Sequence, residues 1–164
     1  METKSKRVQT PLSPTNVRVL ARDILLVPIL RAGLVLLEEA KTVLPVTNTY
    51  HLGFARDEET LEAKMYLNKL PSQFPEGQRV LISDPMLATG GTIVKAIDEC
   101  VSRGAKVSDI RVVCVVTCPP ALTILSDKYP GLRLYAAMID EELNDEGYIM
   151  PGLGDAGDRA FGTE

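Results

Sequence analysis

The chain has 164 residues, of which 45% are hydrophobic and 5% aromatic, and its formal net charge is −4. This size and composition predict one globular α/β domain with a real core. The negative charge and the lack of any long basic run argue against nucleic acid and an anionic membrane surface as partners. No stretch approaches the length of a membrane span, so we expect no membrane partner.

Three cysteines, Cys100, Cys114 and Cys118, show no metal-type spacing, and we predict no metal site built by the protein itself. The last two lie four residues apart in a strand-like run, too far apart for a disulfide. We interpret all three as reduced core thiols in a reducing compartment. The N-terminus lacks the apolar stretch of a signal peptide, which favours the cytoplasm; an organelle is the alternative, with the basic first residues as a transit-peptide remnant.

The first elements follow a polar, basic and proline-containing N-terminal tail, which we assign to residues 1–22. The single globular domain would then span residues 23–164. "DILLVPIL" (23–30) is a short continuous apolar run, typical of a strand buried on both faces of a parallel sheet. "AGLVLLEEAKTVL" (32–44) predicts a helix that Pro45 ends.

The middle of the chain predicts two further strands, at residues 46–56 and 63–70. They flank the charged stretch "DEETLE" (57–62), which is typical of a surface turn or a mobile flap. Residues 71–77 form a loop by composition.

The second half alternates strands and helices, which predicts a mainly parallel, twisted sheet with right-handed crossovers, flanked by helices. The predicted strands are residues 79–85, 109–118 and 132–140, and the predicted helices are residues 91–104 and 119–131. The glycine-rich C-terminal stretch, residues 147–164, contains too many turn formers for a regular element.

The loop "SDPMLATGGT" (83–92) joins a predicted strand to a predicted helix, the place where ligands bind in open α/β sheets. Gly90 and Gly91 allow close backbone approach, and the start of a helix favours a phosphate. Thr89 and Thr92 add hydroxyl donors, while the carboxylate of Asp84 suits ribose hydroxyls. The residues therefore indicate phosphate donors and a sugar acceptor in one loop.

Spacing alone leaves an alternative open for this loop. It is equally compatible with a plain strand-to-helix connection in which Thr92 lies near the N-cap. It is not a Walker loop, since no Gly-Lys-Ser/Thr follows, and it lacks the dinucleotide-binding glycine pattern.

Three separated motifs carry a resemblance to a known family. "ISDPMLATGGT" (82–92) resembles the 5-phosphoribosyl 1-pyrophosphate (PRPP) binding signature of type I phosphoribosyltransferases, and its Asp-Pro pair resembles the uracil phosphoribosyltransferase branch. "VPILRAGL" (27–34) is similar to the pyrophosphate-binding loop of that branch, and "GYIMPGLGDAGDRAFGT" (147–163) to its uracil-binding C-terminus. "ARDEETLE" (55–62) resembles its flap, so the resemblance runs from about Ile24 to Glu164.

The resemblance implies a type I phosphoribosyltransferase-like α/β fold with a C-terminal base-binding segment. It implies that uracil and PRPP give uridine monophosphate (UMP) and diphosphate, with Mg²⁺ bound mainly through the diphosphate. It also implies a homodimer or higher homo-oligomer and GTP as an effector.

The resemblance also implies the site residues. Arg31, Asp84 and Asp155 would be catalytic. The PRPP ligands would be Arg31, Arg56, Asp84, Pro85, Met86, Leu87, Ala88, Thr89, Gly90, Gly91, Thr92 and Asp155. The uracil ligands would be Ile149, Gly154, Asp155 and Ala156.

These assignments agree with the chemistry of the implied reaction. Breaking the bond at the anomeric carbon places negative charge on the leaving diphosphate, where Arg31 and Arg56 would stabilise it. The alternative for each arginine is a surface ion pair. Asp158 is interpreted as a structural acid, and His51, the only histidine, as a structural imidazole.

The chain departs from the family at its N-terminus. Family members usually carry helices before the strand at Ile24, where this sequence has a short tail. We expect the lack of those helices to expose apolar surface in a shortened form, or in one that a partner covers. A second hypothesis therefore stands: a non-catalytic PRPP- or nucleotide-binding protein of the same fold with a regulatory or assembly role.

Overall fold

The computed structural model describes residues 3–44, 48–56 and 63–163. At its centre is an eight-stranded sheet in which all neighbouring strands are parallel except β5 and β6. In spatial order the main strands are β10 (Arg133–Ile139), β9 (Ile110–Thr117), β7 (Arg79–Ser83), β3 (Ile24–Leu30), β5 (Leu52–Arg56) and β6 (Ala63–Asn68). Two short strands join them: β4 (Asn48–Thr49) pairs with β3, and β8 (Met86–Leu87) pairs with β9. The predicted mainly parallel sheet is confirmed.

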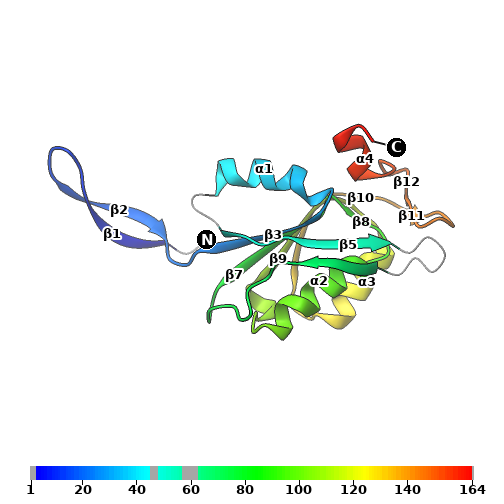
Figure 1. Cartoon of the computed structure of the whole chain (residues 1–164), viewed down its shortest axis with the longest axis horizontal. Coiled ribbons are helices and arrows are strands. Elements are labelled where there is room, and N and C mark those ends of the chain that lie inside the picture. Colours follow the sequence, from blue (N-terminus) through cyan, green and yellow to red (C-terminus); the bar gives the residue numbers. More distant parts are fainter. Residues whose placement is uncertain (1–2, 45–47, 57–62, 164) are drawn as a thin grey trace.

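Helices cover both faces of this sheet. Helix α1 (Gly33–Val43) lies on one face, and α2 (Gly91–Ser102) and α3 (Pro119–Lys128) lie on the other (Figure 1). The predicted helices at these positions are confirmed, including the prolines that begin α3. A short 3₁₀ turn, η1 (Val107–Asp109), leads into β9.

Strand β3 shows why the core has two halves. Leu25, Val27 and Ile29 are buried in the cluster on the α2 and α3 side. Ile24 and Leu26 are buried on the α1 side. Since successive side chains of a strand point to opposite faces, a strand covered on both faces must be apolar throughout. The apolar run therefore has the burial that the sequence predicts.

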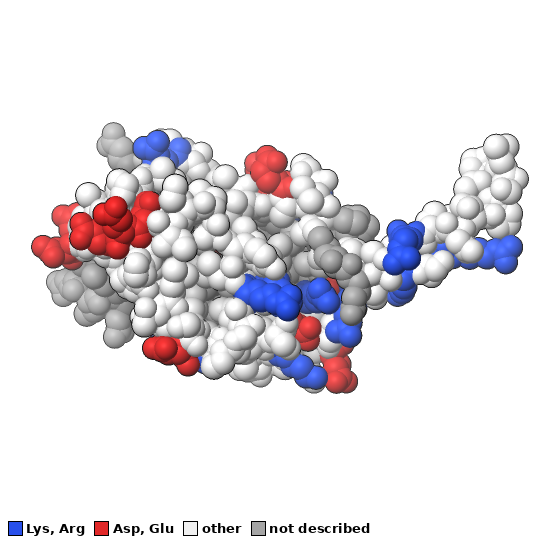
Figure 2. Space-filling view, turned by 180° about the vertical axis from the view of Figure 1, so that it is seen from behind, with Lys and Arg blue, Asp and Glu red and all other residues white. Residues whose placement is uncertain are grey.

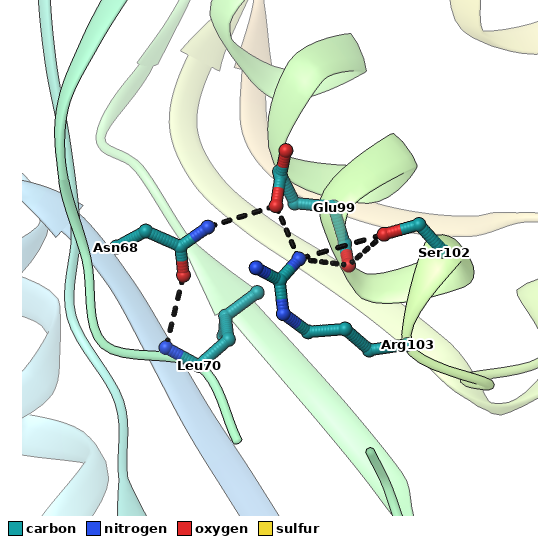
Figure 3. Close-up of polar contacts among 5 residues, drawn as sticks. All are labelled: Asn68, Leu70, Glu99, Ser102 and Arg103. Carbon is teal, nitrogen blue, oxygen red and sulfur yellow. Dashed lines mark hydrogen bonds and ion pairs between the residues drawn. The ribbon is translucent and has the colours of Figure 1, made fainter. Parts of the chain in front are cut away.

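The edge strand β6 is fastened to α2 by a polar cluster (Figure 3). The Asn68 side-chain amide donates to a Glu99 carboxylate oxygen at 2.8 Å, and Arg103 donates to the same oxygen. Nearer the start of β6, the Lys95 ammonium of α2 donates to the Ala63 carbonyl. These contacts hold the antiparallel β5–β6 ribbon against α2. The predicted flap, residues 57–62, lies outside the described residues.

The N-terminal residues form a β-hairpin that the sequence analysis did not assign. Strand β1 (Thr3–Gln9) pairs antiparallel with β2 (Pro14–Leu20), from Thr3 opposite Leu20 to Gln9 opposite Pro14. The hairpin projects from the body of the molecule (Figure 1). Figure 2 shows lysine and arginine side chains on it, and acidic side chains gathered at the opposite end of that face. Because most of its residues are exposed, it lacks the alternation of apolar and polar residues that reveals a half-buried strand.

The expectation of no regular element in residues 147–164 is wrong. Strand β12 (Ile149–Met150) pairs with β11 (Glu142–Leu143), and helix α4 (Ala156–Phe161) follows. The Asp155 side chain accepts a hydrogen bond from the first turn of α4, and Gly162 ends the helix in a left-handed conformation. Caps at both ends therefore stabilise a helix too short to show a hydrophobic period.

The sequence analysis expects exposed apolar surface and no membrane-spanning segment, and the structure gives an observation on each. The outer strand β10 exposes the apolar side chains of Tyr135, Met138 and Ile139. Within the described part of the chain, no helix is both long enough and apolar enough to cross a membrane.

The three cysteines are free and buried, as the interpretation of reduced core thiols requires. Burial raises the pKa of Cys100 to about 12 and that of Cys114 to about 12. Burial also raises the pKa of Cys118. A raised pKa lowers the thiolate fraction at neutral pH, and the thiolate is the reactive species.

We therefore expect all three thiols to react with a water-soluble aromatic disulfide more than about tenfold slower in the native protein than in urea, at about pH 8. Release of the coloured thiol product measures the rate. A cysteine that reacts at the unfolded rate would contradict the burial of its side chain.

Candidate active site

A cavity of about 520 Å³ lies at the carboxyl ends of β3 and β7. Its lining comes from the turn after β3, the loop after β7, and the C-terminal residues around β12 and the start of α4. The helix after β3 lies on one face of the sheet and the helix after β7 lies on the other (Figure 1). Ligand sites of open α/β sheets form where the connections diverge in this way.

Most of the residues predicted from sequence meet at this cavity. Those that line it are Arg31, Asp84, Met86, Leu87, Ala88, Thr89, Gly90, Thr92, Ile149, Gly154, Asp155 and Ala156. Pro85 and Gly91 do not line it. Arg56 ends β5, and its side chain lies outside what the structure describes.

The start of α2 is open toward a ligand. Gly90 is at the N-cap with φ = 83°, and no side chain caps the helix in the described structure. Thr92 is the second residue of the helix, two positions after the N-cap. The Gly91 amide donates to the Thr89 hydroxyl at 3.4 Å. Apart from that of Gly91, the first amides of α2 have no described side-chain partner, and with the partial positive charge of a helix start they favour an anion such as phosphate.

The first half of the same loop is fixed to the sheet. The Pro85 carbonyl accepts hydrogen bonds from the amides of Val115 and Val116 at 2.9 and 3.0 Å. The Thr117 hydroxyl donates to the Leu87 carbonyl at 3.1 Å. Pro85 thus anchors the loop to β9, and the half-buried Asp84 beside it lines the cavity.

Arg31 follows β3 directly and reaches the C-terminal helix. The Leu30–Arg31 peptide bond is cis. Nη2 of Arg31 lies 3.0 Å from Oδ1 of Asp158, and Nη1 lies 3.4 Å from the Thr163 hydroxyl oxygen. Arg31 therefore forms the surface ion pair considered as its alternative, while its side chain also lines the cavity.

The C-terminal segment brings backbone groups and one carboxylate to the cavity. Ile149 is buried against Val116 and Cys118, which fixes β12 beside the loop after β7. Gly154 is exposed with φ = 70°. Oδ1 of Asp155 accepts from the Asp158 amide at 2.9 Å. A flat base with alternating donors and acceptors can be bound by backbone N–H and C=O groups in such a segment.

Comparison with known proteins decides the family. A family model described as uracil phosphoribosyltransferase matches residues 1–163. This chain belongs to the uracil phosphoribosyltransferase family. The resemblance described from the three motifs is therefore confirmed.

Curated members of the family are similar over nearly the whole chain. A tobacco uracil phosphoribosyltransferase is 56% identical over 158 residues, which are 95% of this chain and 70% of the tobacco protein. A uracil phosphoribosyltransferase of Arabidopsis thaliana, named as chloroplastic, is 54% identical over 96% of this chain and 54% of its own length. The chain thus spans only part of the length of these relatives.

Solved structures agree on the fold. AQ2163 protein from Aquifex aeolicus superposes with a TM-score of 0.89 at 39% identity, over 98% of this chain and 76% of that one. An APRTase from Giardia lamblia superposes with a TM-score of 0.57 at 18% identity, over 85% and 94% of the two chains. The expected type I phosphoribosyltransferase fold is confirmed.

Several lining residues of this family member were not predicted. They are Ile29, Leu30, Ala32, Phe54, Ile93, Glu146, Gly147, Tyr148 and Gly157. Most of them lie within the motifs described from sequence and the rest lie next to one, so membership of the motifs or proximity to them was the available signal. Phe54 comes from β5, and only the pairing of β5 with β3 brings it to the cavity. His51 does not line the cavity.

The two loop glycines differ in what they contribute to the fold. A Cβ at Gly90 would lie 3.3 Å from the Ala121 backbone, at a positive φ that disfavours other residues. A Cβ at Gly91 would approach only the Thr89 hydroxyl, at 3.7 Å.

We therefore expect Gly90→Ala to lower the free energy of unfolding by about 1–2 kcal/mol. Gly91→Ala should leave it unchanged or raise it by up to about 1 kcal/mol, since alanine suits a helix start. Urea unfolding of the matched pair measures both values. Equal destabilisation by the two substitutions would contradict the described start of α2.

Proposed function

We propose that this protein transfers the phosphoribosyl group of PRPP to uracil, giving UMP and diphosphate. One observation carries the proposal: segments far apart in the chain, at Arg31, at residues 84–92 and at residues 149–156, line the same cavity. This reaction needs a site for a diphosphate, a ribose phosphate and a flat base side by side. The three segments supply one each.

The loop after β7 holds the ribose phosphate in this proposal. The uncapped start of α2, with the backbone of Ala88, Gly90 and Gly91, binds the 5-phosphate. The hydroxyls of Thr89 and Thr92 donate to the same group, as proposed from sequence. Asp84 accepts hydrogen bonds from ribose hydroxyls, a role that suits an acceptor-only carboxylate.

The remaining loop residues have supporting roles. Met86 and Leu87 shape the wall of the cavity, and Pro85 contributes through its bonds to β9. We keep these three residues in the proposed set of PRPP ligands because they belong to the loop that binds PRPP in this proposal.

The C-terminal segment binds uracil in this proposal. Backbone groups of Ile149, Gly154 and Ala156 bind the edges of the base, and the exposed turn at Gly154 keeps that approach open. Asp155 serves the base, PRPP or a metal-bound water. One of its carboxylate oxygens accepts from the start of α4, which fixes the orientation of the group.

Departure of diphosphate leaves positive charge on the ribose and adds negative charge to the leaving group. Arg31 binds that group, with Arg56 as its partner from the end of β5, and stabilises it more strongly as the bond breaks. Asp84 and Asp155 both line the cavity, and in this proposal their carboxylates stabilise the ribose cation. Positioning and electrostatics thus account for most of the catalysis, without a histidine base.

Mg²⁺ fits this site as an ion that arrives on PRPP. Among the described side chains, no three His, Cys, Asp or Glu groups are arranged to hold a metal ion. Asp84 and Asp155 are hard oxygen donors that suit the waters of a Mg²⁺ bound mainly to the diphosphate. When bound, the ion would neutralise charge on the leaving group.

The partners and compartment are also proposed. A homo-oligomer would cover the apolar side chains that β10 exposes. GTP as an effector, and a cytoplasmic or organellar location, rest on the family resemblance. The division at residue 22, between the N-terminal hairpin segment and a phosphoribosyltransferase domain, is likewise proposed.

The proposal is tested by UMP formation from uracil, PRPP and Mg²⁺, followed by chromatography. We expect turnover by the purified chain. Binding of PRPP without turnover would overturn this choice and support the non-catalytic alternative. No feature of the described residues favours that alternative at present.

Arg31→Ala should lower kcat/KM by about 10²–10³, since one preorganised donor to developing charge is worth that much. Arg133→Ala removes an exposed arginine at the start of β10, away from the cavity lining, and is the matched control. Unchanged turnover in Arg31→Ala, with its fold intact by circular dichroism, would refute the diphosphate assignment.

A further inference from the structure

Asp158 is the centre of a closed ring of polar contacts beside the cavity. Its Oδ1 accepts from Nη2 of Arg31 at 3.0 Å and from the Thr163 hydroxyl at 2.6 Å. The same hydroxyl oxygen accepts from Nη1 of Arg31 at 3.4 Å. Both terminal nitrogens of the guanidinium are therefore held by the C-terminal segment.

Asp158 is fixed in position and ionised, so it can hold the guanidinium group of Arg31. Its amide donates to Asp155, which caps α4. Gly157, just before it, is buried, and a Cβ there would lie 3.2 Å from Oδ1 of Asp155 and 3.8 Å from Nη2 of Arg31. The hydrogen bond from Thr163, with that from Arg31, lowers the pKa of Asp158, so the group is ionised at neutral pH.

The two partners differ in their relation to the cavity. Arg31 lines it and Asp158 does not. The carboxylate thus holds the guanidinium from outside the cavity. An arginine has five N–H donors, and the two contacts occupy one donor on each terminal nitrogen, so donors remain for an anion inside.

Folding stability is a poor explanation of this ion pair. The side chains of Arg31 and Asp158 are 55% and 31% exposed, and pairs of this kind contribute little to stability. Holding a long arginine in one conformation lowers the entropy it must lose when it binds a ligand. Orientation of Arg31 is the role that the geometry supports.

We propose that Asp158 is a positioning residue that orients Arg31 toward the diphosphate and joins the base-binding segment to the diphosphate loop. This inference rests on the proposed function, because the diphosphate that Arg31 would bind is assigned only by that proposal. Asp158 does not line the cavity, so in this proposal it acts through its contact with Arg31. It is therefore more than the structural acid expected from sequence.

The test is a double-mutant cycle of Asp158→Asn and Arg31→Ala. Asparagine keeps the shape of the side chain and loses its charge. We expect Asp158→Asn to lower kcat/KM for PRPP about tenfold, the scale of a misoriented binding group. In the Arg31→Ala background the same change should have less than about a twofold effect, because residues that act as a unit are not additive.

Two controls make the cycle specific. Asp127→Asn removes the same charge from an exposed position on α3, off the cavity lining, and should leave kcat/KM unchanged. Thr163→Ala removes the hydroxyl of the ring and keeps the carboxylate. Thr163→Ala should lower kcat/KM in the wild-type background and leave it unchanged in the Arg31→Ala background. If Asp158→Asn fails to fold, Thr163→Ala takes its place in the cycle.

Three results would overturn the proposal. The first is an equal loss from Asp158→Asn with and without Arg31, which would mean a structural role. The second is tighter PRPP binding in Asp158→Asn, which would mean that Asp158 withholds Arg31 from the ligand. The third is no change in kcat/KM.

A second readout separates this proposal from the proposed function. Titration calorimetry measures the Kd of inorganic diphosphate, in the presence of Mg²⁺, for the four proteins of the same mutant cycle. This measurement does not depend on catalysis. Wild-type protein that binds diphosphate but forms no UMP would refute the proposed function and leave the cycle to decide the role of Asp158. Wild-type protein that does neither would overturn both.

Discussion

Burial of β3 on both faces is the constraint on which the arrangement of this protein depends. A strand in that position needs cover on each side, and α1 supplies one layer while α2 and α3 supply the other. The chain must therefore leave the parallel strands β3 and β7 toward opposite faces. Two loops then diverge at one edge of the sheet, and the space between them is where Arg31 and Gly90 come together. The site follows from how the core is built.

Much of this could be predicted from the sequence where a local pattern had a physical cause. The apolar run of β3 predicted its burial because every position faces a core. The glycines and hydroxyls of the loop from Asp84 to Thr92 stand before a helical pattern, and that pattern pointed to the segment that lines the cavity; its binding of a phosphate stays a prediction. In both cases the signal lay within about ten neighbouring residues, the range over which periodicity and turn chemistry operate.

The features that the sequence did not predict are ones that local hydrophobic patterns do not mark. The N-terminal hairpin exposes both faces, so no hydrophobic alternation marks it. Helix α4 has six residues, and its caps at Asp155 and Gly162 are the only local sign of it. The contact between Arg31 and Asp158 joins positions 127 residues apart. Single-sequence patterns do not report such pairs, so an acid that looked merely structural emerged as a partner of Arg31.

The left-handed turn at Gly90 has a consequence for which kinetic constant, KM or kcat, the phosphate-binding loop affects. It sets the direction of the amides at the start of α2, which receive the phosphate in the proposed function. The 5-phosphate is the same group in PRPP and in UMP, and it takes no part in bond breaking. A rigid cradle for it would hold substrate, transition state and product alike, which improves KM and adds nothing to kcat. Under the proposed function, discrimination among these states would then arise around Arg31, the residue proposed to bind the diphosphate.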